Sequence, residues 1–302
     1  MPIRQNVAQS PSHQLGEQIG VICEDFLARD IVKKCLKECE KQEYYLDYQH
    51  ERKAREGKKT VKWEDGLGNS HRLDLVIEQF GTEEEMGELR AIIEVGWRRY
   101  TKHSKAKAQE IQGAVNPVVE KYRHLSPYKG VIIIGDWTKP SIKQLGSEGF
   151  VILHFTTKMI FDCIKENAGF DVSFSEDTEV KELLMKAEKF NNISDETREK
   201  IVNCLLKVNG DEVKKFKKSL KSSLDRKVTK VEILRQEIDR IEFGSMNSAI
   251  DALTEGQFEF VEDKERYQCV VEFNSEEYTR ISLPDLNAVI KLLQQLDALY
   301  AK

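Results

Sequence analysis

Two acidic residues interrupt apolar segments of the chain. Asp74 lies within His71–Gln79 and Glu94 lies near the end of Leu89–Val95, and the apolar content of both segments predicts β-strands. A carboxylate in such a strand is costly to bury unless it is neutralised, hydrogen-bonded or bound to a cation. If the two strands are hairpin neighbours, the two carboxylates meet at one edge of the sheet. Such a pair suits Mg²⁺, a hard cation that takes one or two carboxylates, several waters and phosphate oxygens.

Positive charges follow Glu94 directly along the chain. The segment from Trp97 to Lys107 has no acid and contains five cations, Arg98, Arg99, Lys102, Lys105 and Lys107. These groups would attract and orient a phosphate backbone, and a bound metal ion would activate water to attack the phosphodiester. The aromatic rings of Trp97 and Tyr100 could stack on bases. The alternative for the same residues is structural, with acids paired to nearby arginines and aromatic rings packed on the core.

Apolar periodicity predicts the elements that must position these residues. Helices are expected over Leu15 to about Gln42, Ser104–Tyr122 and Lys139–Gly146, and strands over Thr60–Glu64, His71–Gln79, Leu89–Val95, Gly130–Gly135 and Gly149–Phe155. The polar and basic residues 43–59 are expected to form a loop or a fraying helix. This order predicts an α/β fold with a mixed sheet, in which an antiparallel meander is followed by right-handed helical crossovers.

The element order and the placement of the acids resemble the restriction-endonuclease-like, or PD-(D/E)XK, nucleases over roughly residues 15–157. The resemblance implies an αβββαβ core in which Asp74 and Glu94 bind a divalent metal, Mg²⁺ or Mn²⁺. It also implies that an acid of the first helix, Glu24 or alternatively Glu17, joins the metal site.

The family's usual lysine, two residues after the second acid, is replaced by Gly96 in this chain. The resemblance then implies a catalytic cation from the following segment, Lys102 or Lys105. It assigns phosphate binding to Arg98, Arg99 and Lys107.

The resemblance implies a metal-dependent endonuclease that hydrolyses phosphodiester bonds of DNA in bacterial restriction or antiphage defence. Gly96 supports a second hypothesis from a different functional class. In that hypothesis the chain is a catalytically inactive nuclease-fold subunit that binds DNA or a partner protein within a defence complex.

The composition of the chain changes near residue 170. We expect a nuclease domain at residues 1–170 and a helical plus small α+β region at residues 171–302. Residues 178–240 are rich in helical patterns, alternation over 256–283 predicts two or three strands, and Pro284 opens a terminal amphipathic helix. Residues 213–230 hold eight cations against one acid, whereas residues 255–277 hold eight acids against two cations. The basic segment would extend a DNA footprint, and the acidic end suits a protein partner or a second copy of the chain.

The overall composition excludes several classes of protein. The 302 residues include 47 Lys+Arg and 52 Asp+Glu, which gives a net charge of −5. No apolar run approaches the ~20 residues of a membrane-spanning helix, and the N-terminus lacks the apolar core of a secretory signal. We therefore expect a cytoplasmic protein without membrane contact and with its six cysteines reduced.

Overall fold

The computed structural model describes residues 11–40, 43–175, 177–235, 239–255, 266–275 and 278–300. A five-stranded sheet with the strand order β1-β4-β5-β6-β7 forms the centre of its larger part. The strands are β1 (Tyr44–Asp47), β4 (Leu75–Gln79), β5 (Glu88–Arg98), β6 (Tyr128–Gly135) and β7 (Val151–Phe155). The pairs β1–β4 and β4–β5 are antiparallel, and β5–β6 and β6–β7 are parallel. The predicted mixed α/β sheet is therefore confirmed.

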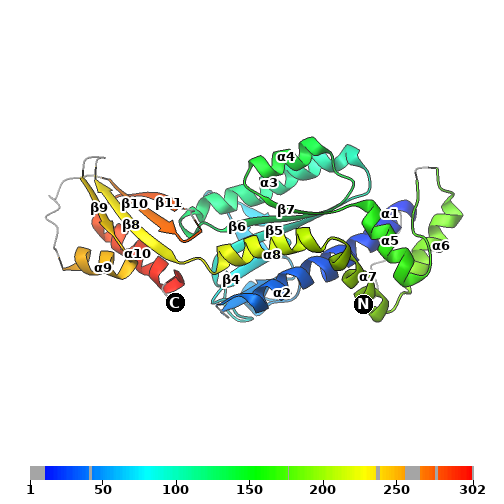
Figure 1. Cartoon of the computed structure of the whole chain (residues 1–302), viewed down its shortest axis with the longest axis horizontal. Coiled ribbons are helices and arrows are strands. Elements are labelled where there is room, and N and C mark those ends of the chain that lie inside the picture. Colours follow the sequence, from blue (N-terminus) through cyan, green and yellow to red (C-terminus); the bar gives the residue numbers. More distant parts are fainter. Residues whose placement is uncertain are drawn as a thin grey trace.

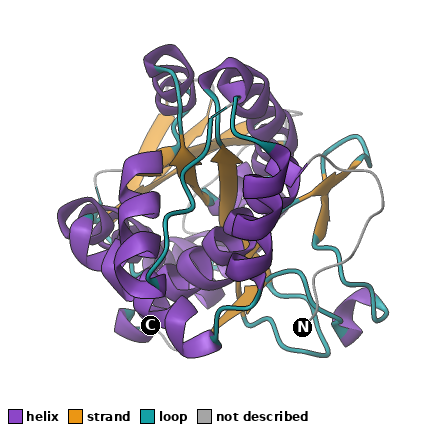
Figure 2. Ribbon diagram, turned by 90° about the vertical axis from the view of Figure 1, so that its right-hand side faces the viewer, coloured by secondary structure: helices purple, strands orange, loops and turns teal. Residues whose placement is uncertain are grey.

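Helices cover both faces of this sheet (Figures 1 and 2). Helices α3 (Ser104–Lys121) and α4 (Lys139–Ser147) pack on one face, where they share a core with Ile92 and Ile133. The other face shares its core with α1 (Pro11–Val21), the π-helix η1 (Ile22–Ala28), α2 (Arg29–Glu38), α5 (Thr157–Ala168), α6 (Val180–Asn191), α7 (Asp195–Val208) and α8 (Gly210–Leu224). The sheet is thus the middle layer of three, which explains why its strands are apolar on both sides.

The structure differs from the predictions for residues 43–79. Strand β1 lies in the segment expected to be a loop or a fraying helix, and the strand predicted at Thr60–Glu64 is confirmed but does not join the main sheet. Instead β2 (Lys62–Glu64) pairs with β3 (Ser70–Arg72) in a separate two-stranded hairpin. The predicted strand His71–Gln79 is consequently two strands, β3 and β4, which are separated by Leu73 and Asp74.

A buried ionic network explains why β1 is a strand despite its polar surroundings. The guanidinium of Arg52 lies 3.0 Å from Asp47 of β1 and 2.7 Å from Glu78 of β4, and none of these three side chains is exposed. Arg55, in the 3₁₀-helix η2 (Lys53–Arg55), also pairs with Asp47. Buried charges of this kind need partners, and these partners are contributed by different elements.

A second sheet forms the remainder of the structure, to the left in Figure 1. Its order is β11-β10-β8-β9, with β8 (Val228–Arg235), β9 (Asp239–Phe243), β10 (Tyr267–Phe273), β11 (Tyr278–Leu283), α9 (Met246–Thr254) and α10 (Leu286–Tyr300). The strand predictions at Tyr267–Phe273 and around Ile281 are confirmed, as is the terminal helix after Pro284. The helix-rich segment ends at Leu224 rather than near residue 240, and residues 256–265 lie outside the described ranges.

The domain boundary near residue 170 stays a prediction. Helices α6, α7 and α8, which follow it, belong to the same apolar core as α1, α2 and the five-stranded sheet. Within the described ranges, no helix combines the length and apolar character needed to cross a membrane.

One cysteine pair differs from the expectation that all six are reduced. Cys163 of α5 and Cys204 of α7 form a disulfide, and their Cα atoms are 5.7 Å apart. These two helices pack side by side, so the separation of the two residues falls in the ordinary range for a disulfide. Cys23, Cys35, Cys39 and Cys269 are free and buried.

Candidate active site

The structure brings together Asp74 and Glu94, the two acids singled out from the sequence. Leu75 of β4 is paired with Ile93 of β5, so Asp74 lies beside Glu94 at the start of β4. The backbone N–H of Asp74 donates to Glu94 Oε1 at 3.2 Å, and the backbone N–H of Val95 donates to Asp74 Oδ2 at 2.9 Å. These hydrogen bonds fix both carboxyl groups at one place on the sheet.

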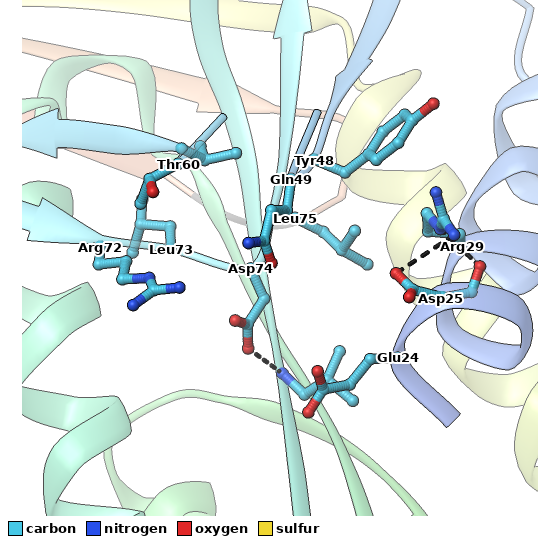
Figure 3. Close-up of a pocket in the computed structure, with 12 residues that line it drawn as sticks. Glu24, Asp25, Arg29, Tyr48, Gln49, Thr60, Arg72, Leu73, Asp74 and Leu75 are labelled. Atoms are coloured by element: carbon cyan, nitrogen blue, oxygen red, sulfur yellow. Dashed lines mark hydrogen bonds and ion pairs between the residues drawn. The ribbon is translucent and has the colours of Figure 1, made fainter. Parts of the chain in front are cut away.

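Glu24 comes to the same place from the π-helix η1. It lines a narrow cavity of about 40 Å³ together with Asp74, Arg29 and Arg72. Figure 3 shows Glu24 and Asp74 in the wall of this cavity. Glu17, the alternative acid of the first helix, instead pairs with His13 at 3.6 Å and lines a different hollow. A single-turn π-helix often occurs at a functional site, and here it carries the third acid.

Burial and the charge of Asp74 raise the pKa values of Glu94 and Glu24. The side chain of Glu94 is buried, and this burial, together with the charge of Asp74, raises its pKa well above the ordinary value. Glu24 is exposed to solvent along part of its side chain. Partial desolvation of its carboxyl group, followed by the charges of Asp74 and Asp25, raises its pKa to about 7. Negative charge is therefore crowded at this site, which is the condition that a bound cation relieves.

The donor set fits a magnesium ion. Within the described ranges, no three His, Cys, Asp or Glu side chains form a ready-made metal cluster. Mg²⁺ does not need one, because it keeps several waters and is usually held by one or two carboxylates. Asp74 and Glu94 would supply those carboxylates, and Glu24 and Asp25 lie in the same cavity wall as Asp74.

Lys107 acts on both Glu24 and Glu94. Its charge lowers the pKa of each carboxyl group, although it does not outweigh burial and the neighbouring acids, and Arg98 also lowers the pKa of Glu24. The Lys107 side chain is 15% exposed, and its Nζ donates to Glu110 at 2.7 Å. The expectation that Lys107 holds a phosphate group stays a prediction.

The two lysines favoured from the sequence are not among the main charges that shift the pKa values of Glu24 and Glu94. Lys102 is in the 3₁₀-helix η3 (Thr101–His103), with its Nζ 5.4 Å from the centre of the Tyr100 ring. Lys105 is exposed in the first turn of α3. Residues two apart on an α-helix differ by about 200° in direction, so Lys105 points away when Lys107 faces the sheet.

Gly96 lies where the resemblance would place a lysine, and the structure closes that position to any side chain. A Cβ atom at Gly96 would be 2.9 Å from the Trp137 ring, which is itself buried and hydrogen-bonded to the carbonyl of Ile134. Because Trp137 cannot move aside easily, a cation at this site would have to come from another element.

Arg98 and Arg99 line the same hollow, of about 640 Å³, together with Lys102, Lys107 and aromatic residues. The Arg99 guanidinium also donates to Asp136 at 2.9 Å and to the carbonyl of Phe174 at 2.8 Å, and it lies 5.3 Å from the Phe174 ring centre. These contacts fix the position of the Arg99 guanidinium. Lys107 both lines this hollow and acts on Glu24 and Glu94, so the hollow and the acids share one residue.

Comparisons with known proteins give little further information. No family model matches the chain, and no curated protein matches it. A solved structure of a protein of unknown function, AF1548, is similar over 66% of this chain and 99% of its own, with 12% identity and a TM-score of 0.27. A likeness of this size supports no conclusion about fold or function.

Proposed function

We propose that this protein is a metal-dependent deoxyribonuclease of the PD-(D/E)XK type that hydrolyses phosphodiester bonds. The observation that carries the proposal is the pairing of Asp74 and Glu94 across β4 and β5, each carboxylate bonded to a backbone N–H of the opposite segment. The run of a first helix, strands β1, β4 and β5, helix α3 and strand β6 supports the same family, because it follows the αβββαβ order.

Asp74 and Glu94 would hold Mg²⁺ or Mn²⁺. When bound, the metal would lower the pKa of water and offset the negative charge that develops on the phosphate. Glu24 lies in the same cavity wall as Asp74, where its carboxylate would accept a proton from the attacking water. Lys107 would stabilise the charge of the phosphate oxygens, while Arg98 and Lys102 bind the neighbouring backbone.

One observation favours the second candidate function, an inactive DNA-binding or assembly subunit. The position of the family lysine is closed by Trp137, and Lys107 is hydrogen-bonded to Glu110. For both candidate functions we propose a cytoplasmic protein that acts in restriction or antiphage defence. The C-terminal region would be the surface for a partner protein or a second copy of the chain.

Cleavage assays distinguish the two candidates. Purified protein is incubated with supercoiled plasmid, linear duplex and single-stranded DNA, in Mg²⁺, Mn²⁺ or EDTA, beside Glu94→Ala. The matched control is Glu88→Ala, which removes the acid at the other end of β5. We expect metal-dependent cutting that Glu94→Ala abolishes and Glu88→Ala retains. DNA binding without cutting of any substrate would overturn the nuclease and support the assembly subunit.

A further inference from the structure

The β2–β3 hairpin carries features that the proposed active site does not use. Its second strand ends at Arg72, so only Leu73 separates the hairpin from Asp74 of the site. At its tip, Leu67 is 90% exposed, which makes it the most exposed large apolar residue among those the structure describes. Single exposed leucines are common on proteins, so the tip alone decides nothing.

The turn holds this leucine rigidly. Oδ1 of Asp65 accepts the backbone N–H groups of Leu67 and Asn69, both at 2.9 Å. Its Oδ2 contacts Asn69 Nδ2 at 3.0 Å and His71 Nε2 at 2.9 Å. Gly68 has a φ of +82°, a conformation that strains other residues. None of these bonds involves the Leu67 side chain, so the turn presents the side chain without depending on it.

A second, independent feature lies between the tip and the acids. Lys62 and Arg72 are direct cross-strand partners in the hairpin, and both are exposed. Among the described residues, neither forms an ion pair, whereas the nearby Lys58 and Lys59 pair with Glu56 and Glu51. Like charges directly opposite each other destabilise a strand pair, and an anion bound between them removes that cost.

The position of this cation pair connects it with the active site. Arg72 lines the same cavity as Asp74, and Figure 3 shows the two side chains in that cavity. An anion bound by Lys62 and Arg72 would therefore be close to the phosphate that the proposed active site cleaves. Two neighbouring phosphates of one nucleic-acid strand have this arrangement.

We propose that the hairpin is a contact arm for duplex DNA. Lys62 and Arg72 bind a backbone phosphate beside the cleaved one, and Leu67 inserts at a base step and unstacks it. Apolar side chains inserted in this way kink DNA, while phosphate contacts set the position of the protein. The choice of DNA as the ligand rests on the proposed function.

The length of the arm limits where the distortion occurs. Seven residue steps separate Leu67 from Asp74, and a chain of seven residues spans at most about 23 Å. At 3.4 Å per base pair, the unstacked step lies within about seven base pairs of the cleaved bond.

The phosphate contacts are tested by the salt dependence of binding to a labelled duplex of about 30 base pairs, without Mg²⁺ so that no cutting occurs. The double variant Lys62→Ala/Arg72→Ala should reduce the slope of log Kd against log salt concentration by about 1, because the two cations bind one phosphate. The control is Lys181→Ala/Lys189→Ala, which removes two exposed lysines of α6 and should leave the slope unchanged.

The insertion is tested with 2-aminopurine placed in turn at each base pair near the cleavage site. The wild-type protein should raise its fluorescence at one step, and Leu67→Ala should abolish that rise without changing the salt slope. Leu184→Ala, at a leucine of α6 that is 48% exposed, is the matched control.

The outcomes separate this inference from the nuclease itself. If both hairpin variants behave as wild type while Glu94-dependent cutting persists, the contact arm is overturned and the nuclease stands. If the slope and the fluorescence change but the wild type cuts nothing, the nuclease is overturned and the arm stands. A wild-type protein that binds no DNA overturns both, and a protein partner for the hairpin then takes their place.

Discussion

At the scale of single residues, Glu94 gives the clearest conflict between stability and function. Its carboxyl group is buried beside Asp74, so its negative charge disfavours the folded state when no cation is bound. Groups that raise the free energy of the native state in this way are concentrated at functional sites. Removing the charge of Glu94 should therefore lower the proposed activity and raise the stability of the metal-free protein.

We expect Glu94→Gln to reduce cleavage by about 100-fold or more, which corresponds to about 3 kcal/mol of transition-state stabilisation. In the same variant the side-chain amide oxygen can still accept the N–H of Asp74. Because the buried negative charge is removed, the metal-free protein should be stabilised by about 1 kcal/mol, or roughly 2 °C in Tm. Thermal unfolding in EDTA, with Glu88→Gln as the control, measures the second effect. A lower Tm for Glu94→Gln would contradict this account of the site.

Lys107 provides a test of which lysine serves the reaction. Its charge acts on Glu24 and Glu94, whereas Lys105 is exposed on another side of α3. We expect Lys107→Met to lower the cleavage rate by about 10- to 100-fold with little change in DNA affinity, because it loses electrostatic stabilisation of the transition state. Lys105→Met should retain the wild-type rate. The reverse order of the two variants in single-turnover assays would reject this assignment.

The raised pKa of Glu24 predicts that the stability of the protein depends on pH. Its pKa is raised from 4.5 to about 7 in the folded protein, chiefly by desolvation and by Asp74. Between these two values the folded state holds a proton that the unfolded chain has released, so the contribution of Glu24 to stability is greatest below pH 4.5 and is lost as the pH rises towards 7. In metal-free protein, Glu24→Gln should remove this part of the fall in Tm between about pH 4.5 and pH 7. Identical pH profiles for the two proteins would contradict the prediction.

The sequence predicted the meeting of Asp74 and Glu94 because both are local interruptions of apolar strands that a hairpin joins. It named Lys107 for phosphate binding but did not identify it as the lysine whose charge acts on the acids, since the choice among three nearby lysines depends on the rotation of α3 about its axis relative to β5. That rotation is set by Ala108, Ile111 and Val115, which are buried on the helix face toward the sheet. The apolar positions of α3 therefore contained the signal that separates Lys107 from Lys105.

At the scale of elements, β1 shows that a polar sequence does not always indicate an exposed segment. The segment around it is polar, yet Asp47 of β1 and Glu78 of β4 are fully buried against Arg52. Arg52 and Glu78 are 26 positions apart, so no periodicity within either segment reveals their pairing. Local patterns predict strands that are stabilised by apolar side chains and miss strands stabilised by a distant ion pair.

This network makes Arg52 essential for β1. Arg52→Met would leave the carboxylate of Glu78 buried with fewer donors, and breaking a buried pair in this way costs about 3–5 kcal/mol. Lys53→Met removes only a surface pair with Glu84, in which the lysine side chain is 76% exposed, and should cost less than about 1 kcal/mol. Urea unfolding of both variants measures the difference, and equal midpoints would show that the network contributes little to stability.

At the scale of the whole molecule, a small buried cluster joins the two sheets. Arg226, which precedes β8, is 1% exposed and donates to the carbonyl of Ser126 at 2.8 Å and to the hydroxyl of Tyr300 at 2.7 Å. Tyr300 donates to the carbonyl of Leu125 at 3.0 Å, and Gln79 of β4 donates to the carbonyl of Leu299 at 3.2 Å. The end of α10 is thus fixed against the five-stranded sheet, as Figure 1 shows for the joint between the two parts.

The hydroxyl of Tyr300 therefore links the C-terminal sheet and its helices to the part that contains the five-stranded sheet. Tyr300→Phe keeps the ring against Phe273, whose centre is 5.0 Å away, but removes an acceptor from Arg226 and a donor from Leu125. Because these groups are buried, we expect a loss of about 1–3 kcal/mol, with the C-terminal sheet unfolding at lower urea concentration than the rest. Tyr278→Phe, at a tyrosine that is 65% exposed, should leave a single unchanged transition. A single transition of wild-type midpoint for Tyr300→Phe would mean that apolar packing, and not this hydroxyl, holds the parts together.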